Sequence, residues 1–309
     1  MGAPKQRSQT SQPMANKKKR QRKSFPPPTP QLEARSTQTG SDLRSGGKRW
    51  DLIALFFIVA IGGTYLAVWM NPRNQIPVFT WNKDTVKTYP HDKDAFTQGL
   101  LFHDGLLFES TGLEGKSSIR KVDPESGKVL EQHNLAENLF GEGLVNFGNE
   151  LIQLTWQNKT GIVYDMDLKE VRRFNYDHEG WGICTDGQKL IVSDGTSRLR
   201  FLDPDTFEEI GHLFVRRQDR CILGQLNELD YFGSKIYSNI YNSDKIYRID
   251  AETGFVEAII DLGGLWPFKE RPERGAVING IAIKPDSNGK MWVTGKLCPH
   301  MYEIEVVPK

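Results

Sequence analysis

The amino-acid sequence predicts an all-β protein whose main domain is a five-bladed β-propeller, preceded by a disordered basic tail and one transmembrane helix. Three observations carry this prediction: five similar units in residues 78–309, a hairpin turn inside each unit, and an uncharged stretch at 52–70. The chain has 309 residues, enough for one large domain beside such a tail. The predicted boundaries are 1–49 for the tail, 50–71 for the anchor and 72–309 for the propeller.

Each unit opens with the same arrangement of a strand, a tight turn and a second strand. These openings begin at residues 99, 143, 182, 228 and 280, which leaves room for four short strands in every unit. Their turns read HDG, FGN, TDG, FGS and DSNG, residue types that tolerate the positive φ of hairpin turns. Periods of this length are typical of propeller blades, and an open β-sandwich would not explain five units in phase.

The ends of the repeat region predict how the propeller closes. The fifth unit ends at Lys309 after three predicted strands, at 281–284, 291–294 and 300–306. An extended segment at 78–88 can supply the missing outer strand, which would remove an exposed sheet edge. Residues 263–275 are too long and too charged for a blade connection, so we expect a loop or short helix there, acting as a lid near the site.

Charge divides the chain into two parts. Residues 1–51 carry twelve Lys and Arg against three Asp and Glu, which leaves 28 basic and 36 acidic residues in the remainder. The tail, with its KKKRQRK and PPPTP runs, has too little apolar surface to offset the entropy of ordering. The acidic balance of the body argues against a nucleic-acid partner, because phosphate binding needs a positive surface.

The stretch LIALFFIVAIGGTYLAVWM at 52–70 has the length of a membrane span. At ~1.5 Å per residue a helix of this length covers roughly 28 Å, close to the thickness of the hydrocarbon core. It is too long and too uniformly apolar for a globular core helix, and too far into the chain for a cleaved signal peptide. The apolar stretch that follows the KKKRQRK run argues against a nuclear-localisation function for that run.

Basic residues on the N-terminal side of the span predict its orientation. Such flanks remain in the cytosol, so residues 72–309 would face a lumen in the endoplasmic reticulum or Golgi, as in a type II signal anchor. The sequon at Asn158 would be open to glycosylation in that compartment, although sequons are common by chance.

The cysteines and histidines predict neither a disulfide framework nor a metal site. Cys184, Cys221 and Cys298 can form at most one bridge, or can all be buried thiols. The six histidines give no HxxxH or HExxH pair, so no zinc site is predicted. We predict no metal and no cofactor.

Candidate site residues follow from the repeat itself. In a blade, the residues just before the first strand and just after the second lie on one face, near the central axis. The side chains predicted to form the site at these positions are Phe96, Gln98, Glu142, Trp156, Trp181, Asn227, Tyr241, Asn279 and Lys296. Each has an ordinary explanation alone, as a turn former, a solvated loop residue or blade packing. Together with Glu179, Asp194 and Glu228, which stand at the same positions of the repeat, they predict a ligand pocket with carboxylates, tryptophans and one lysine.

Several short stretches occur in order over most of residues 85–305. They are PHDKDAFTQGL (90–100), LFESTGLEGKSSIRKV (107–122), FGEGL (140–144), GWG (180–182), TDG (185–187), SDGTS (193–197), LNEL (226–229), NGIA (279–282) and VTGKL (293–297). As an ordered set they resemble the plant and bacterial glutaminyl cyclases. The resemblance implies a five-bladed propeller and an acyltransferase that converts N-terminal glutamine of peptides to pyroglutamate with release of ammonia. It also implies no obligate catalytic metal.

The resemblance implies roles for individual residues. Glu142 would be the general acid/base, while Lys296, Asn227 and Gln98 would orient the substrate and stabilise the oxyanion. The walls around the glutamine side chain would be Phe96, Trp156 and Trp181, with Asn279 as a further substrate contact. Tyr241 stands where the family pattern leads us to expect tryptophan, so its assignment is weaker.

Two other functions remain open at this point. A calcium-dependent, lactonase-like propeller hydrolase would need converging carboxylates and amides, which Glu142, Asp194, Glu228 and Asn279 could supply. A non-catalytic propeller that only binds peptides would keep its function after Glu142→Gln.

Overall fold

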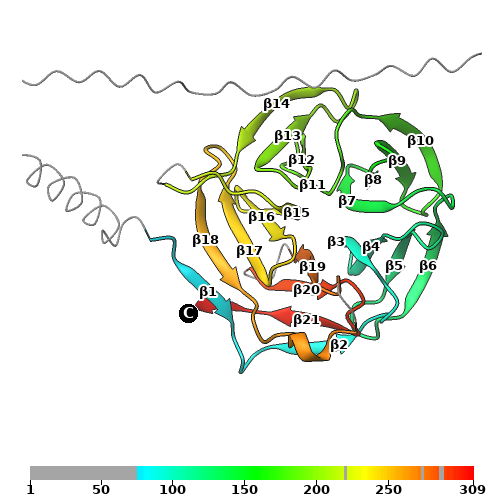
Figure 1. The fold of residues 1–309 in the computed structure, drawn as a ribbon. Helices are drawn as coiled ribbons and strands as arrows, with labels where there is room; N and C mark the ends of the chain where they lie inside the picture. The colour runs from blue at the N-terminus through cyan, green and yellow to red at the C-terminus, as the bar shows by residue number, and fades with distance from the viewer. Residues whose placement is uncertain (1–74, 219–220, 273–274, 285–288) are drawn as a thin grey trace, which may run out of the picture. The chain divides into compact units, whose positions relative to one another are not determined.

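A computed structural model describes residues 75–218, 221–272, 275–284 and 289–309, which form a ring of five β-sheets (Figure 1). This arrangement confirms the predicted five-bladed β-propeller. The predicted tail at 1–49 and the predicted anchor at 50–71 lie outside the described residues. In the part of the chain that is described, no helix combines the length and apolar character needed to cross a membrane.

Three blades consist of four consecutive strands each, with the first strand innermost (Figure 1). Blade one contains β3 (Thr97–His103), β4 (Leu106–Thr111), β5 (Ser118–Val122) and β6 (Val129–Asn134). Blade two contains β7 (Gly141–Phe147), β8 (Glu150–Thr155), β9 (Thr160–Asp165) and β10 (Glu170–Asn175). Blade three contains β11 (Gly182–Thr185), β12 (Leu190–Ser193), β13 (Arg198–Leu202) and β14 (Glu209–Phe214).

The last two blades include strands from both ends of the described chain. Blade four contains β15 (Leu226–Phe232), β16 (Lys235–Ile240), β17 (Lys245–Asp250) and β18 (Val256–Asp261), followed by β1 (Val78–Trp81) and β22 (Val306–Pro308). Blade five contains β19 (Ile278–Ile283), β20 (Met291–Gly295), β21 (His300–Ile304) and, as its outer strand, β2 (Lys87–Pro90). The propeller therefore closes by strand pairing between the two ends, which removes a free sheet edge.

The closing segment differs from the prediction in one respect. Lys87–Pro90 completes blade five antiparallel to β21, as expected of part of the segment at 78–88. Val78–Trp81, however, extends blade four, where it runs parallel to β18 and antiparallel to β22. The predicted strand at 300–306 is correspondingly two strands, because the chain leaves blade five after Ile304 and pairs with β1 from Val306.

Hairpin turns and apolar clusters account for the blades. Asp104 and Gly105 both have positive φ (48° and 83°), as the tight turn between β3 and β4 requires. The buried apolar residues form clusters between neighbouring blades rather than one central core. Ile152 and Leu154 of blade two, for example, belong to one cluster with Ile183 of blade three. Each blade is thus stabilised by its neighbours.

Close packing of the innermost strands leaves little space at the axis. A Cβ on Gly99 would lie 2.5 Å from the backbone nitrogen of Leu144, so this position requires glycine. The equivalent position in blade four is Glu228, whose carboxylate accepts hydrogen bonds from the backbone N–H groups of Leu100 (3.3 Å) and Ile281 (2.9 Å). This side chain therefore ties blade four to blades one and five.

A buried polar cluster joins the closing strand to blade one. His91, which follows β2, contacts Glu109 through Nε2 (3.0 Å) and the carbonyl of Cys298 through Nδ1 (2.6 Å). Glu109 also accepts hydrogen bonds from Thr97 (2.6 Å) and Arg120 (2.9 Å). The cluster therefore links three segments that are far apart in sequence.

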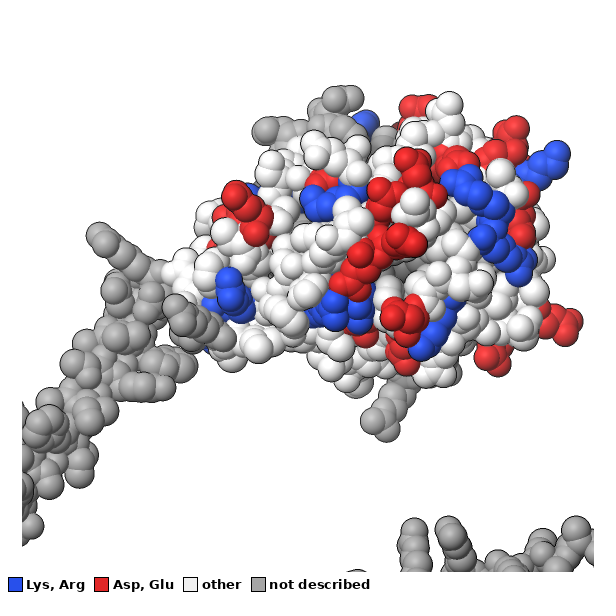
Figure 2. All heavy atoms as spheres, turned by 90° about the horizontal axis from the view of Figure 1, so that it is seen from above, with Lys and Arg blue, Asp and Glu red and all other residues white. Residues whose placement is uncertain are grey.

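The outer surface carries acidic and basic side chains side by side, as the face in Figure 2 shows. On blade three, Arg200 of β13 pairs with Glu209 of β14 at 2.6 Å, and Arg198 contacts the same carboxylate. Such exposed cross-strand pairs contribute little stability each, but they keep the outer strands soluble. Of the three cysteines, Cys184 and Cys298 are buried and Cys221 is exposed, so the interpretation of three buried thiols holds for two of them.

The segment at 263–275 contains the short 3-10 helix η2 (Phe268–Glu270), within the predicted loop or short helix. Arg271 fixes this segment to blade four by hydrogen bonds to both carboxylate oxygens of Asp244 (2.7 Å each). Within the segment it also donates to the carbonyl of Trp266 (2.9 Å). Gly275, the last residue of the segment at 263–275, lines the pocket described below.

Candidate active site

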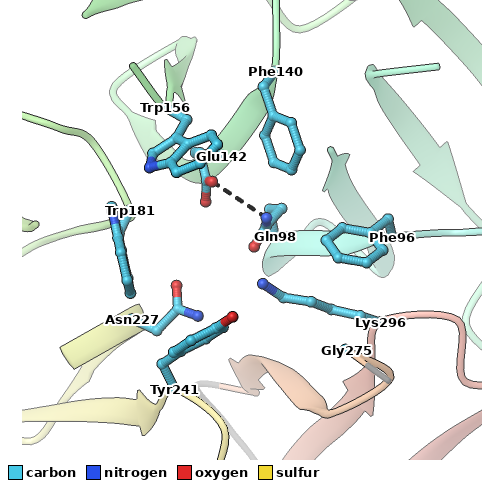
Figure 3. A pocket seen from close by; sticks show the side chains of 10 residues that line it. All are labelled: Phe96, Gln98, Phe140, Glu142, Trp156, Trp181, Asn227, Tyr241, Gly275 and Lys296. Atoms are coloured by element: carbon cyan, nitrogen blue, oxygen red, sulfur yellow. Dashed lines mark hydrogen bonds between the residues drawn. The ribbon is translucent and has the colours of Figure 1, made fainter. Parts of the chain in front are cut away.

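A cavity of about 360 Å³ lies where the innermost strands begin (Figure 3). Its lining consists of Phe96, Gln98, Phe140, Glu142, Trp156, Trp181, Asn227, Tyr241, Gly275 and Lys296. Eight of the nine residues predicted from the repeat are in this set, and the ninth is Asn279. The size lies within the usual range for small-molecule pockets, and the mixture of aromatic walls with a few polar groups is typical of them.

Irregularities in the innermost strands direct three polar side chains into the cavity. The antiparallel register shifts between Thr97 and Gly99, between Gly141 and Leu144, and between Leu226 and Leu229. The residues passed over include Gln98 in blade one, Glu142 in blade two and Asn227 in blade four. A bulge of this kind re-aims a side chain that a regular pleat would direct between the blades.

A second set of side chains follows the second strand of the blades. The backbone N–H of Trp156 donates to Phe140 (3.0 Å), that of Tyr241 to Gln225 (2.8 Å), and that of Lys296 to Val277 (2.8 Å). Each bond fixes the residue after the second strand to the residue before the first. Trp156, Tyr241 and Lys296 are therefore held at the mouth of the innermost hairpin.

Two lining residues were not predicted. Phe140 occupies in blade two the place that Phe96 occupies in blade one, so the repeat alignment contained the signal that would have found it. The two rings lie edge to face with their centroids 6.2 Å apart. Gly275 comes from the loop before blade five, for which the repeat gives no equivalent.

Asn279 lies outside the lining. Its position in blade five matches Gln98 and Glu142, since the register shifts between Ile278 and Ile281. Its side chain, however, is 1 % exposed and donates to the carbonyl of Thr97 at 3.0 Å. In this structure Asn279 links blades five and one, and blade five contributes Lys296 to the cavity instead.

Glu142 is a buried carboxylate with few partners. Its side chain points into the cavity, and Oε1 accepts one hydrogen bond, from Nε2 of Gln98 at 3.2 Å (Figure 3). Burial raises the pKa of Glu142 well above its usual value; the charge of Lys296 lowers this pKa, and that of Glu179 raises it. A carboxyl group whose pKa is raised in this way is a candidate for proton transfer.

Lys296 is a buried amine between two aromatic rings. Its Nζ lies 5.0 Å from the ring centroid of Phe96 and 5.6 Å from that of Tyr241. Burial lowers the pKa of Lys296 to about 8, against the opposing effect of Glu142. The amine therefore remains largely protonated at neutral pH and can stabilise a negative charge that develops in the cavity.

Two amide oxygens in the cavity have no hydrogen-bond partner in the described part of the chain. Oε1 of Gln98 and Oδ1 of Asn227 are buried, and neither accepts a hydrogen bond from any described residue. Buried acceptors are normally satisfied, because an unpaired one costs roughly 1–3 kcal/mol. These two oxygens are thus placed to accept N–H groups of a bound ligand.

The four residues that could have formed a calcium site have separate partners. The carboxylate of Asp194 pairs with Arg200 at 3.3 Å, and both oxygens of Glu228 accept backbone N–H groups. Asn279 binds Thr97, as described above. Among the described residues, no three His, Cys, Asp or Glu side chains are grouped to hold a metal ion.

The fold is a five-bladed propeller, and its cavity brings a buried carboxylate, a buried amine and aromatic walls together. Comparison with known proteins gives its family. A sequence model of the glutamine cyclotransferase family matches residues 60–306, which is most of the chain. The chain therefore belongs to the glutamine cyclotransferase family.

Two relatives show how far the similarity extends. The glutaminyl-peptide cyclotransferase of Arabidopsis thaliana is 42% identical over 228 residues, covering 72% of this chain and 71% of that protein. The crystal structure of glutaminyl cyclase from Myxococcus xanthus superimposes with a TM-score of 0.70 at 34% identity, covering 76% of this chain and all of that one. The resemblance seen in the sequence is thereby confirmed.

Proposed function

We propose that this chain is a glutaminyl-peptide cyclotransferase, which converts the N-terminal glutamine of peptides to pyroglutamate and releases ammonia. One observation supports this most strongly: Glu142 and Lys296 point into one small aromatic cavity that also holds two unpaired amide oxygens. The name of the Arabidopsis relative points to the same reaction.

The cavity suits a glutamine side chain with its own α-amine. The rings of Phe140, Trp156 and Trp181 form apolar walls that would exclude water from the methylene groups. The unpaired oxygens of Gln98 and Asn227 would accept N–H groups of the substrate amine and carboxamide. Because both reacting groups belong to one residue, the enzyme has only to select the folded-back rotamer and to move protons.

Glu142 would carry the proton through the reaction. The neutral α-amine attacks the γ-carboxamide carbon, and the carboxylate of Glu142 removes one proton from the attacking nitrogen. It then delivers this proton to the carboxamide nitrogen as the carbon–nitrogen bond breaks and ammonia leaves. One proton is taken and one is returned, so the enzyme ends in its starting state.

Lys296 would stabilise the tetrahedral intermediate between these two transfers. The former carbonyl oxygen becomes negatively charged, and a buried ammonium group stabilises such a charge more strongly than water does. Glu142 and Lys296 together supply every proton transfer and charge in this sequence, so the proposed mechanism uses no metal ion.

Mass spectrometry of a glutamine-initiated peptide tests the proposal. The purified full-length chain should convert it to the product that lacks one ammonia, and Glu142→Gln should slow the conversion by about a thousandfold. Glu137→Gln is a matched control, because Glu137 lies five residues earlier and is exposed. No conversion by the natural chain would refute the proposed activity, and loss of activity with chelator would favour the calcium-dependent alternative.

We also propose the domain arrangement predicted from the sequence: a cytosolic tail at 1–49, a membrane anchor within 50–71 and a lumenal propeller from residue 72. It is supported by the apolar stretch at 52–70 and the basic residues before it. Asn158 is exposed, as a glycosylated residue must be. Extraction of the chain from membranes by alkaline carbonate would contradict the anchor. An unchanged electrophoretic mobility after Asn158→Gln would contradict the glycan.

A further inference from the structure

Glu179 holds the two tryptophan walls of the cavity. Its Oε2 accepts hydrogen bonds from the indole N–H of Trp156 (2.8 Å) and from that of Trp181 (3.0 Å). Its other oxygen accepts from Nε2 of Gln157 (3.2 Å). Glu179 is not among the residues that line the cavity, and it contacts the cavity walls through the indole N–H groups.

The loop that carries Glu179 is itself well anchored. This loop joins β10 of blade two to β11 of blade three. In it, the hydroxyl of Tyr176 donates to the carbonyl of Thr155 (2.5 Å), one residue before Trp156. The ring of His178 stacks on Tyr176 at 4.9 Å, and its Nδ1 contacts the carbonyl of Glu179 (2.7 Å). The position of Glu179 is thus determined by packing on blade two.

The charge of Glu179 also acts on the site. The hydrogen bonds from the indoles lower the pKa of Glu179, so it is ionised at neutral pH. Its negative charge in turn raises the pKa of Glu142. One side chain therefore influences both the walls of the cavity and the proposed acid/base group.

We propose that Glu179 is a positioning residue that fixes Trp156 and Trp181 against the substrate. This inference rests on the proposed cyclotransferase function. It assigns a role to a residue that the repeat analysis placed near the face but did not select.

Two variants separate the two effects. Glu179→Gln keeps an oxygen for the indoles and removes the charge, whereas Glu179→Ala removes both. Asp177→Asn is the matched control, because it removes a negative charge from an exposed residue in the same loop. Each full-length variant is assayed for kcat and KM with a glutamine-initiated peptide over a range of pH. Tryptophan fluorescence gives a readout that does not depend on activity.

We expect Glu179→Ala to lower kcat/KM about tenfold to a hundredfold, mostly through KM, because two charge-assisted hydrogen bonds are lost. Its tryptophan emission should shift relative to the natural chain. Glu179→Gln should change KM less, but should move the acidic limb of the kcat profile lower by on the order of half a pH unit, since a like charge is removed. Asp177→Asn should change neither quantity.

The two proposals can fail separately. If the natural chain does not convert the peptide, the cyclotransferase function is refuted, and an unchanged emission of Glu179→Ala would refute the positioning of the indoles as well. If the natural chain is active, unaltered kinetics and emission of Glu179→Ala would overturn the positioning role. Equal pH profiles of Glu179→Gln and Asp177→Asn would contradict the effect of the Glu179 charge on Glu142.

Discussion

Two glutamates of this propeller are equally hidden from solvent and have opposite acid–base properties. Glu109 is 1 % exposed and Glu142 is 5 % exposed. The pKa of Glu109 is lowered to about 2, because the charges of His91 and Arg120 outweigh the effect of burial. The pKa of Glu142 is raised well above its usual value, because burial dominates and, among the described residues, only Gln98 donates a hydrogen bond to its carboxylate.

The difference shows that the charges of neighbouring side chains, together with burial, decide the pKa of a buried carboxylate. Glu109 is surrounded by donors and contributes to stability by closing the propeller. The carboxylate of Glu142 has one hydrogen-bond donor in the cavity among the described residues, and it can therefore take up a proton. Its ionised form costs stability at neutral pH, as is common for groups in active sites.

The largest expected effect is on catalysis, from Glu142→Gln. This variant cannot exchange a proton, so we expect kcat/KM to fall by about a thousandfold, within the usual range for general acid–base groups. Its melting temperature should be equal to or higher than that of the natural chain, because a disfavoured charge is removed. Steady-state kinetics and thermal unfolding measure the two quantities. A stable Glu142→Gln variant with full activity would contradict the proposed acid–base role of Glu142.

Glu109→Gln should instead affect folding. It leaves Arg120 and His91 buried without their common partner, and breaking a buried pair costs about 3–5 kcal/mol. Urea unfolding should show this loss, while Glu131→Gln on the surface should change the free energy of unfolding by less than about 1 kcal/mol. Equal effects of the two substitutions would show that the cluster around Glu109 does not stabilise the closure.

The two carboxylates should also respond differently to acid. The pKa of Glu109 is depressed in the folded state, so its contribution is present above its unfolded pKa and is lost as pH falls from about 4.3 to about 2. That contribution is on the order of 3 kcal/mol. In Glu109→Gln the unfolding free energy should vary less with pH over this interval, and an unchanged pH dependence would contradict the assignment.

Activity should have a basic limit set by Lys296. Its pKa of about 8 implies that the charge for the oxyanion is lost as pH rises through that value. Lys296→Arg keeps a charge at all accessible pH values, so the basic limb of the kcat profile should move upward even if kcat itself is lower. An identical basic limb in both proteins would assign that limit to another group.

The smallest expected effect concerns the wall beside Lys296. Tyr241 is 43 % exposed and lies edge to face with Trp181 at 5.5 Å. Tyr241→Ala removes this ring from Lys296, and we expect kcat/KM to fall by roughly tenfold, as loss of a partly desolvated cation–π contact implies. Tyr241→Phe should change kcat/KM by less than about threefold, since the ring is kept. Equal losses in both would indicate that the hydroxyl group matters instead.

The sequence predicted most of the cavity lining, because that lining depends on the repeat. Gln98, Glu142 and Asn227 were expected just before the first strand; each is the second residue of that strand, and bulges turn all three into the cavity. Asn279 has the same position but different surroundings, because its side-chain amide donates a hydrogen bond to the carbonyl of Thr97. A repeat predicts where a residue lies, whereas its direction depends on neighbours from another blade.

Contacts between distant segments could not be predicted in this way. To predict the parallel pairing of Val78–Trp81 with β18, one must know which blade the chain meets first. The cluster of His91, Glu109 and Cys298 likewise combines three segments without a common motif. Glu179 was visible beside Trp181 in the sequence, but only the structure shows that it also binds Trp156.

The pKa values of the two buried glutamates test the central claim most directly. Carbon-13 NMR of glutamate side-chain carboxyl groups, with Glu142→Gln and Glu109→Gln used for assignment, gives each titration separately. We predict that Glu142 titrates well above the usual range of glutamate, alongside the acidic limb of kcat, and that Glu109 titrates near 2. An ordinary pKa for Glu142, or one no higher than that of Glu109, would contradict this account.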